Sequence, residues 1–478
     1  MERATLRIER GELGDASYRF AAPLDFELLR GEHIALVGAN GSGKTLLVET
    51  LLGRRPLRSG RLEYGFPTGS RTAGGVRYIA FHETYNRAED GEYYYQQRWN
   101  SCDNEHAPRV GELLDRIECR EPALRDELYD RLSLRPLLDK PVVMLSSGEL
   151  RKFQIVRMLL TQARVLVVDN PFIGLDAEAR QLLHELLARL TAVEGLQLIL
   201  VSADEADMPP FITHVYRIED RRLGPKIPAG AFRRQPGPVL PTIALPAAER
   251  EPPACAEAVQ LCGVTVRYGD RTILESIDWT IRSGECWALS GPNGAGKSTL
   301  LSLISADNPQ AYAQEIVLFG RRRGTGESIW EIKRRIGYVS SEMHRSFLKP
   351  IPAVNIVASG YFDSLGLYET PTGAQLASAV AWMEAFGIGA VAERPFLQLS
   401  SGEQRLALLA RAFVKDPDLL ILDEPLNGLD EANRTRVRAI VDAFCSRRGK
   451  SLIYVSHVES DWPSCIGHRF ELKRKAKE

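Results

Sequence analysis

The feature that most constrains this 478-residue sequence is an internal repeat. Four motifs return in the same order: GANGSGKT at 38–45 as GPNGAGKST at 291–299, LSSGE at 145–149 as LSSGE at 399–403, VLVVDNPFIGLD at 165–176 as LLILDEPLNGLD at 419–430, and LILVSAD at 198–204 as LIYVSHV at 452–458. The offset is 253 residues at the first pair and 254 at the other three. Chance does not hold one register over four separated motifs, so the chain is a tandem duplication.

The segment between the copies predicts a linker. Residues 221–257 are rich in proline, and such density disfavours helix and central strand. We therefore expect domain one at 1–220, an extended linker at 221–257 and domain two at 258–478. Within each copy, short apolar runs that read as strands alternate with helical stretches, which predicts an α/β fold around a largely parallel sheet.

Composition excludes several classes of protein. Lys plus Arg (61) nearly balances Asp plus Glu (62), so the overall charge does not favour nucleic acid or acidic membranes as partners. The seven cysteines are scattered without a CxxC pair, which predicts neither a disulfide framework nor a zinc site. The N-terminus does not read as a secretory signal, and no apolar run is long enough to span a membrane. We expect a cytoplasmic protein that reaches a membrane only through another protein, peripherally at its inner face.

Each copy contains a complete GxxxxGK[ST] loop between a strand-like and a helix-like stretch. The glycines allow the backbone N–H groups to surround phosphates, the lysine reaches the β- and γ-phosphates, and the following hydroxyl is a ligand for Mg²⁺. The predicted nucleotide-binding residues of these loops are Gly38, Asn40, Gly41, Gly43, Lys44 and Thr45, and Gly291, Asn293, Gly294, Gly296, Lys297, Ser298 and Thr299.

A carboxylate ends a buried strand-like run in each copy, at Asp169 and Asp423. A carboxylate at the carboxyl end of a strand and facing the phosphate loop is well placed to hold Mg²⁺, in part through water. The predicted metal residues are therefore Thr45, Asp169, Ser298 and Asp423.

The motifs occur in an order that resembles the ATP-binding cassette (ABC) superfamily: the phosphate loop, LSSGE, the strand-end aspartate, the GLD turn and the SH dipeptide. The resemblance implies two P-loop NTPase nucleotide-binding domains, each a mainly parallel sheet with flanking helices, a small antiparallel β part and a helical signature subdomain. It also implies that the two cassettes pair within one chain and share ATP. Ser146, Ser147 and Gly148 would then face the nucleotide on Lys297, and Ser400, Ser401 and Gly402 the nucleotide on Lys44.

The fixed register shows where the copies differ. Glu424 follows Asp423, and in the family this glutamate acts on the attacking water, but copy one has Asn170 at that position. His457 matches the family's γ-phosphate histidine, and its counterpart is Ala203. We therefore predict that Glu424, His457 and Lys297 form a competent catalytic site, while the first site binds MgATP and cleaves it slowly.

Two further positions follow from the resemblance. Tyr268 matches the aromatic residue that stacks on adenine, and Phe20 or Tyr18 is the candidate in copy one. The glutamine that in the family links nucleotide state to a membrane partner is absent from both expected places, which hold Ser341 in copy two and Phe81 or His82 in copy one.

Segments of copy two, among them VLFGRRRGTGESIWEIKRRIGYVSS and LSSGEQRLALLARAFVKDPDLLILDEPLNGLD, resemble tandem cassettes of the ModF/PhrA, or photorepair, type. That resemblance implies an ATPase associated with molybdate transport, with an integral-membrane permease as partner. The alternatives are an ABC-F-like translation factor on the ribosome and a fused motor of a monosaccharide-type importer. The short, proline-broken linker disfavours the former, and the missing glutamines disfavour the latter.

Overall fold

The computed structural model consists of two compact units, residues Met1–Pro236 and Gly237–Glu478. It describes residues 4–14, 19–66, 75–80, 108–117, 122–142, 145, 147–160, 163–172, 177–191, 195–205, 208–234, 243–248, 250–251, 255–269, 271–292, 294–340, 343, 347, 350–364 and 369–473.

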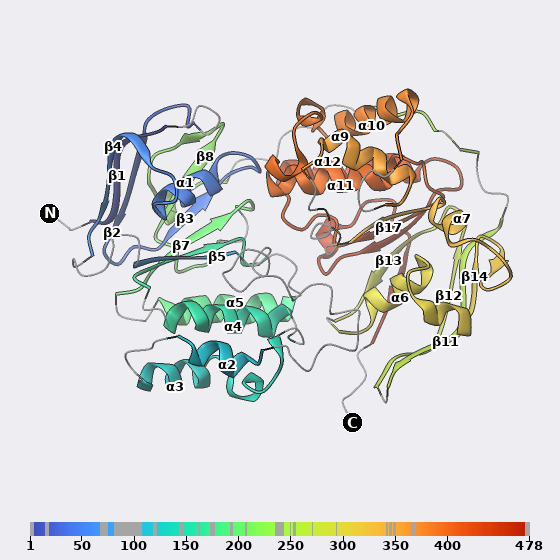
Figure 1. Ribbon diagram of the computed structural model, residues 1–478, viewed down its shortest axis with the longest axis horizontal. Coiled ribbons are helices and arrows are strands. Elements are labelled where there is room, and N and C mark those ends of the chain that lie inside the picture. The colour runs from blue at the N-terminus through green and yellow to red at the C-terminus, as the bar shows by residue number, and fades with distance from the viewer. Residues whose placement is uncertain are drawn as a thin grey trace. The chain divides into compact units, whose positions relative to one another are not determined.

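The first unit is an α/β domain with two sheets (Figure 1). Its strands are β1 (Ala4–Leu13), β2 (Leu24–Leu29), β3 (Ile34–Val37), β4 (Leu57–Tyr64), β5 (Val76–Ala80), β6 (Val165–Asp169), β7 (Gln197–Ser202), β8 (His214–Glu219), β9 (Arg222–Leu223) and β10 (Ile227–Pro228). Its helices are α1 (Lys44–Leu51), α2 (Val110–Asp115), α3 (Pro122–Arg131), α4 (Ser147–Leu160) and α5 (Ala177–Leu190), with short 3₁₀ helices at Arg135–Leu137 and Ala229–Ala231.

The second unit repeats this plan. Its strands are β11 (Glu257–Tyr268), β12 (Arg271–Arg282), β13 (Cys286–Ser290), β14 (Glu315–Leu318), β15 (Arg321–Arg322), β16 (Ile336–Val339), β17 (Leu419–Asp423), β18 (Ser451–Val455) and β19 (His468–Glu471). Its helices are α6 (Lys297–Ile304), α7 (Ile329–Lys333), α9 (Ala353–Ala358), α10 (Gly373–Ala385), α11 (Ser401–Phe413) and α12 (Glu431–Cys445). Short 3₁₀ helices lie at Pro309–Ala313, Ser359–Tyr361, Gly389–Val391, Phe396–Gln398 and Glu459–Asp461.

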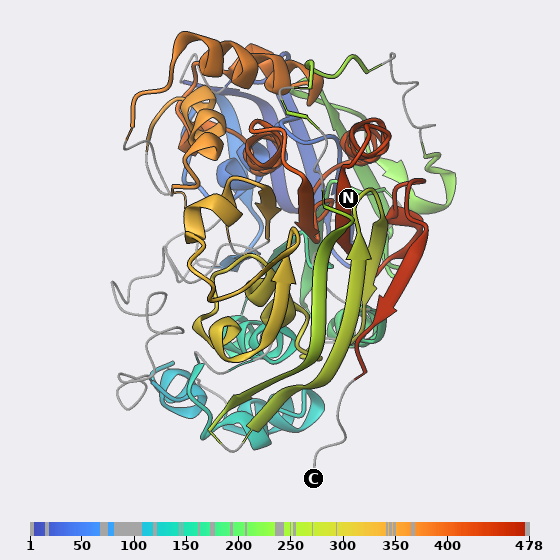
Figure 2. The same ribbon diagram turned by 90° about the vertical axis from the view of Figure 1, so that its right-hand side faces the viewer.

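The strand order shows that the two units share one topology. The parallel part of the first large sheet runs β5-β6-β7-β3-β8, and that of the second runs β16-β17-β18-β13-β19. Each unit also has a smaller antiparallel sheet, β2-β1-β4 in the first and β12-β11-β14-β15 in the second. Figure 2 shows the long β11–β12 pair of the latter. The predicted fold class is confirmed.

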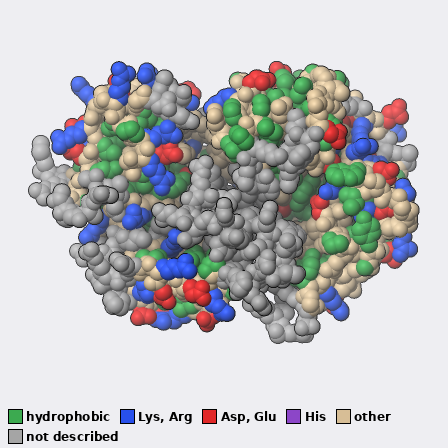
Figure 3. All heavy atoms as spheres, in the orientation of Figure 1, with side chains coloured by type: hydrophobic (Ala, Val, Ile, Leu, Met, Phe, Trp, Pro, Cys, Tyr) green, Lys and Arg blue, Asp and Glu red, His purple; other side chains and the backbone are tan. Residues whose placement is uncertain are grey.

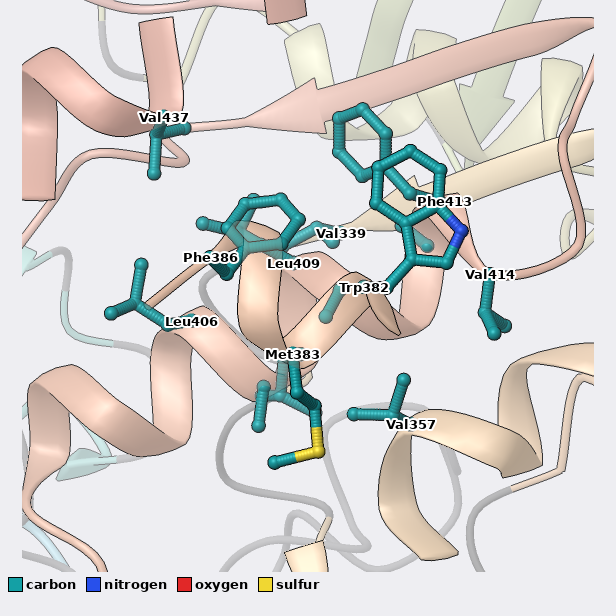
Figure 4. Packing of buried hydrophobic residues seen from close by; sticks show 14 of the residues in the cluster. Val339, Val357, Trp382, Met383, Phe386, Leu406, Leu409, Phe413, Val414 and Val437 are labelled. Atoms are coloured by element: carbon teal, nitrogen blue, oxygen red, sulfur yellow. The ribbon is translucent and has the colours of Figure 1, made fainter. Parts of the chain in front are cut away.

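The central parallel strands β17 and β18 of the second unit are buried on both faces because their side chains alternate between two cores. Leu420 and Leu422 of β17 join the core formed with α9–α12, whereas Leu419 and Ile421 join the core formed with α6, β11 and β12. The first of these cores centres on Trp382 of α10, as Figure 4 shows. Its ring lies 5.2 Å from that of Phe413 and 6.2 Å from that of Phe444, centroid to centroid.

The proline-rich segment differs from the predicted linker at both ends. β9 and β10, at 222–228, pair antiparallel with β8 and so extend the first unit's large sheet. Pro228 is tolerated there because β10 is an edge strand, where one missing N–H removes no ladder bond. Toward the other end, Ile243 and Leu245 pack on the core of the second unit. The prediction of an extended linker over all of 221–257 was therefore wrong for these parts, because apolar residues between the prolines pack against the two units.

No helix in the part of the chain that the structure describes has the length and apolar character needed to cross a bilayer. Figure 3 shows basic and acidic side chains interspersed on the visible face, as the near balance of charges implies.

Candidate nucleotide site

Both phosphate loops begin where a central parallel strand ends. β13 runs into the loop at Gly291 and α6 starts at Lys297, while β3 leads to Gly38 and α1 starts at Lys44. A crevice at the carboxyl ends of such strands is where open α/β sheets bind ligands. The helix N-terminus adds N–H groups that attract phosphate.

Glycine is required in these loops. Gly291 has a φ of +141°, and a Cβ added to it would lie 2.4 Å from the carbonyl oxygen of Leu472. Gly38 is its counterpart, and a Cβ there would lie 2.2 Å from the carbonyl oxygen of Ile218. The backbone therefore approaches its neighbour so closely that a side chain does not fit, and both positions require glycine.

The two loop lysines have the same conformation. Lys297 Nζ donates to the carbonyl oxygen of Gly291 at 2.6 Å, and Lys44 Nζ donates to that of Gly38 at 2.6 Å. The conformation of the loop lysines therefore does not distinguish the two copies.

The residues that follow the two strand-end aspartates also have the same backbone conformation. Glu424 has a φ of 51° and donates its N–H to Val455 at 3.0 Å, and Asn170 has a φ of 48° and donates its N–H to Val201 at 2.8 Å. Non-glycine residues rarely adopt a positive φ, and such strain gathers at functional sites. The difference between the copies here is in the side chain alone.

In copy two, three predicted catalytic residues converge. His457 Nε2 lies 3.4 Å from Lys297 Nζ and 3.5 Å from Glu424 Oε1. Glu424 Oε1 is buried and has no hydrogen-bond partner among the described residues. Burial, and then the neighbouring charge of Asp423, raise the pKa of Glu424 to about 8, against the opposing effect of two cations. A carboxylate with a raised pKa is a stronger base than an ordinary one, so once ionised it can accept a proton from water.

In copy one, the side chain of Asn170 is held by hydrogen bonds. Its Nδ2 donates to Asp169 Oδ1 at 2.7 Å, and its Oδ1 accepts from the N–H of Ala203 at 3.3 Å. Tyr78 donates to the other oxygen, Asp169 Oδ2, at 2.7 Å. The amide thus bridges the strand-end carboxylate and the position where copy two has its histidine, and it offers no basic group.

Two contacts were missed by sequence reasoning. Arg405 of α11 is partly buried, donates from Nε to the carbonyl oxygen of Pro425 at 3.1 Å, and also donates to that of Glu424. Burial lowers its pKa to about 10. This arginine fixes the backbone that carries Glu424. It follows LSSGEQ directly, but its partner lies 19 residues away, so no local signal reveals the contact. The Tyr78–Asp169 hydrogen bond, over 91 residues, is hidden in the same way.

The signature segment of copy two caps α11. Ser400 Oγ accepts the N–H of Glu403 at 3.3 Å, and Glu403 Oε2 accepts the N–H of Ser400 at 2.8 Å. This capping box leaves Ser401 and Gly402 in the first helical turn, where N–H groups point outward. In copy one, α4 starts at Ser147, so the LSSGE motif again opens a helix.

The candidate adenine residues are aromatic side chains near the loops. Tyr268 ends β11, is 51% exposed, and its hydroxyl accepts from Asn308 Nδ2 at 3.1 Å. In copy one, Phe20 lies against the loop, since a Cβ added to Gly43 would be 3.4 Å from Phe20 Cε1. The other sequence predictions, at Tyr18, Phe81, His82, Ser146, Asn293 and Ser341, lie outside the described residues.

Comparison with known proteins agrees with this geometry. The family model described as "ABC transporter" matches residues 21–173 and 274–427, which together make up more than half of the chain. The chain is 37% identical over 459 residues to the "ABC transporter ATP-binding protein ModF" of Escherichia coli (strain K12), a match that covers 92% of this chain and 91% of that protein. It is 28% identical over 481 residues to an uncharacterized ABC transporter ATP-binding protein, C323.04, of Schizosaccharomyces pombe, which covers 95% of both.

Among solved structures, the "Model of ribosome-bound archaeal Pelota and ABCE1" matches with a TM-score of 0.59 at 19% identity, covering 96% of this chain and 75% of that one. At this identity the likeness concerns the fold alone. Two matched cassettes and a relative similar over nearly its whole length show that this chain is a tandem ATP-binding protein of the ABC transporter family, whose members hydrolyse ATP.

Proposed function

We propose a division of labour between the two copies, in which the second hydrolyses MgATP and the first binds it. We also propose that the protein is an ATP-binding component of molybdate transport. The observation that carries the division is the convergence of Lys297, His457 and Glu424 in copy two, against the bridging amide of Asn170 in copy one.

The residues of copy two fit an ATP phosphate chain and its Mg²⁺. Gly291 of the loop has no room for a side chain, and Asp423 and Ser298 are oxygen donors of the kind that Mg²⁺ prefers. Glu424 Oε1 is buried without a hydrogen-bond partner among the described residues. Mg²⁺, when bound, neutralises charge on the phosphates. Glu424 would orient the attacking water and accept its proton, and His457 would contact the γ-phosphate.

Copy one retains the loop of Lys44 and the oxygen donors Thr45 and Asp169, so we expect it to bind MgATP. It lacks a proton acceptor because an amide is not basic at neutral pH. We further propose, from family resemblance, that Ser146, Ser147 and Gly148 complete the site on Lys297, and that Ser400, Ser401 and Gly402 complete the site on Lys44.

The test of the division uses a pair of variants at matched positions. Glu424→Gln should lower steady-state ATPase activity at least about 100-fold, the usual contribution of a general base. Asn170→Glu should leave the rate within about twofold, because its neighbour Ala203 still provides no imidazole. MgATP binding by both variants confirms that they are folded. If Glu424→Gln retains most of the activity, the division of labour is wrong.

The support for a transport role is the 37% identity to ModF over most of both chains. In such a role the protein would couple the closing and opening of its cassettes to a membrane permease, with closure favoured by ATP and release following hydrolysis. We propose that the permease, rather than this chain, handles the oxyanion.

The test is affinity purification of the full chain carrying Glu424→Gln in MgATP, combined with cellular molybdenum content in strains with and without the gene. A copurifying multi-span permease and a fall in molybdenum on deletion support the transport role. Copurifying ribosomes would instead support the translation-factor alternative. Unchanged molybdenum content with no permease would overturn the molybdate assignment while leaving the ATPase assignment intact.

A further inference from the structure

Three of the scattered cysteines meet at one place in the second unit. Cys286 starts β13, Cys445 ends α12, and Cys465 precedes β19. Their Sγ atoms all lie within 4.8 Å of one another. The sequence spacing predicted no metal site, and it was a poor guide because strand pairing and helix packing bring together residues far apart in the chain.

The arrangement has the dimensions of a thiolate metal site. A Zn²⁺ ion bonded to sulfur at about 2.3 Å in tetrahedral geometry holds its sulfurs about 3.8 Å apart. The three Sγ atoms would need to draw together by no more than about 1 Å to reach that spacing. Cys286 is buried, whereas Cys445 and Cys465 are partly exposed, so an ion has a way in from solvent.

Neighbouring groups fix the backbone at two of the three cysteines. Asp442 Oδ1 accepts the backbone N–H of Cys465 at 2.8 Å, and the backbone N–H of Gly467 donates to the carbonyl oxygen of Cys286 at 3.1 Å. Such hydrogen bonds orient the residues that carry the ligands.

The first unit shows that the fold does not require sulfur here. Strand register makes the units superimposable at this corner, because Ile34 pairs with His214 as Trp287 pairs with His468. The residue preceding Ile34 is His33, and its ring packs edge-on against Phe211, with 6.0 Å between centroids. Phe211 takes the place of Cys465, so ordinary aromatic packing closes the same corner in copy one.

We propose that Cys286, Cys445 and Cys465 bind one thiophilic metal ion of the Zn²⁺ and Cu⁺ class. Three cysteine sulfurs are the ligand type that such ions select, and a fourth position remains for water. The ion would join β13, α12 and the approach to β19, and so would stabilise the sheet that carries the catalytic loop without taking part in hydrolysis.

The test uses the full chain, purified under reducing conditions, stripped with a chelator and titrated with Zn²⁺ against a chromophoric competitor. We expect one equivalent of Zn²⁺ per chain and a higher thermal unfolding temperature in its presence. Co²⁺ in place of Zn²⁺ should give thiolate charge-transfer absorbance. Cys445→Ser and Cys465→Ser are preferred variants because their side chains are only partly buried, and Cys262→Ser on β11 is the matched control.

Each of the two variants should weaken Zn²⁺ binding at least about tenfold and lose the metal-dependent rise in unfolding temperature, while Cys262→Ser keeps both. Equal unfolding temperatures of all four proteins without metal show that folding is intact. A wild-type chain that binds no Zn²⁺ and no Cu⁺ overturns the proposal. So does Zn²⁺ binding that is the same in Cys445→Ser, Cys465→Ser and Cys262→Ser.

Discussion

The pH dependence of hydrolysis follows from the burial of Glu424. A proton acceptor works only when ionised, and burial together with Asp423 places the pKa of this carboxyl at about 8. Because the pKa is raised, activity is lost as pH falls below about 8. About 10% of the carboxyl is ionised at pH 7 and about 1% at pH 6, so kcat/KM for MgATP should rise about tenfold from pH 6 to pH 7 and level off above pH 8.

The assay is steady-state phosphate release at low MgATP, because kcat/KM reports ionisation in the free enzyme. The control is Glu424→Gln, which lacks the titrating group. Its residual rate should be about 100-fold to 10,000-fold lower and independent of pH, equivalent to about 3–5 kcal/mol in the activation barrier. Nucleotide affinity of this variant, measured at each pH, separates the ionisation of ATP from that of the enzyme.

A wild-type kcat/KM that stays flat between pH 6 and pH 8 would refute the reasoning, provided that affinity for MgATP is also flat. So would a pH profile of the same shape in Glu424→Gln, because the titrating group would then be another residue.

Two further pairs of substitutions test the packing of the second unit and the asymmetry of the loops. Trp382→Ala should destabilise that unit by about 3–5 kcal/mol, since it empties the centre of an aromatic core, while Trp330→Ala, whose side chain is 57% exposed, should change stability by less than about 0.5 kcal/mol in urea unfolding. Lys297→Ala should lower ATPase activity at least about 100-fold, and Lys44→Ala less than tenfold, because only the former removes phosphate stabilisation from the hydrolysing site. Equal losses would show that both sites turn over.

The motifs predicted both the fold and the position of the loop residues. A GxxxxGK[ST] loop requires a strand before it and a helix after it, and the structure has β13 and α6 on either side of 291–296. Asp423 was expected at a strand end, and it is the last residue of β17. These motifs are local in the sequence. Because the repeat presents each motif twice, they are easier to recognise.

Features that depend on long-range packing could not be predicted in this way. Arg405 meets the backbone of Glu424 only because α11 packs beside β17, and no motif links the two. The cysteine cluster needs the parallel pairing of β13 with β19 and the end of α12 at the same corner. Pro228 was expected in a linker because proline excludes central strands, but an edge strand accepts it.

The shared backbone at residues 170 and 424 implies that the two copies diverged in chemistry while keeping one scaffold. Asn170 and Glu424 have nearly the same φ, and each donates its backbone N–H to the corresponding carbonyl oxygen in the neighbouring strand of its own unit. A carboxylate at Asn170 would lose the hydrogen bond that its amide donates to Asp169 and would place two negative charges side by side. Because Tyr78 holds the other oxygen of Asp169, that carboxylate has little freedom to turn away. If the proposed division of labour holds, hydrolysis in copy one should return only when an imidazole at Ala203 and a glutamate at Asn170 are introduced together, and neither change alone should restore it.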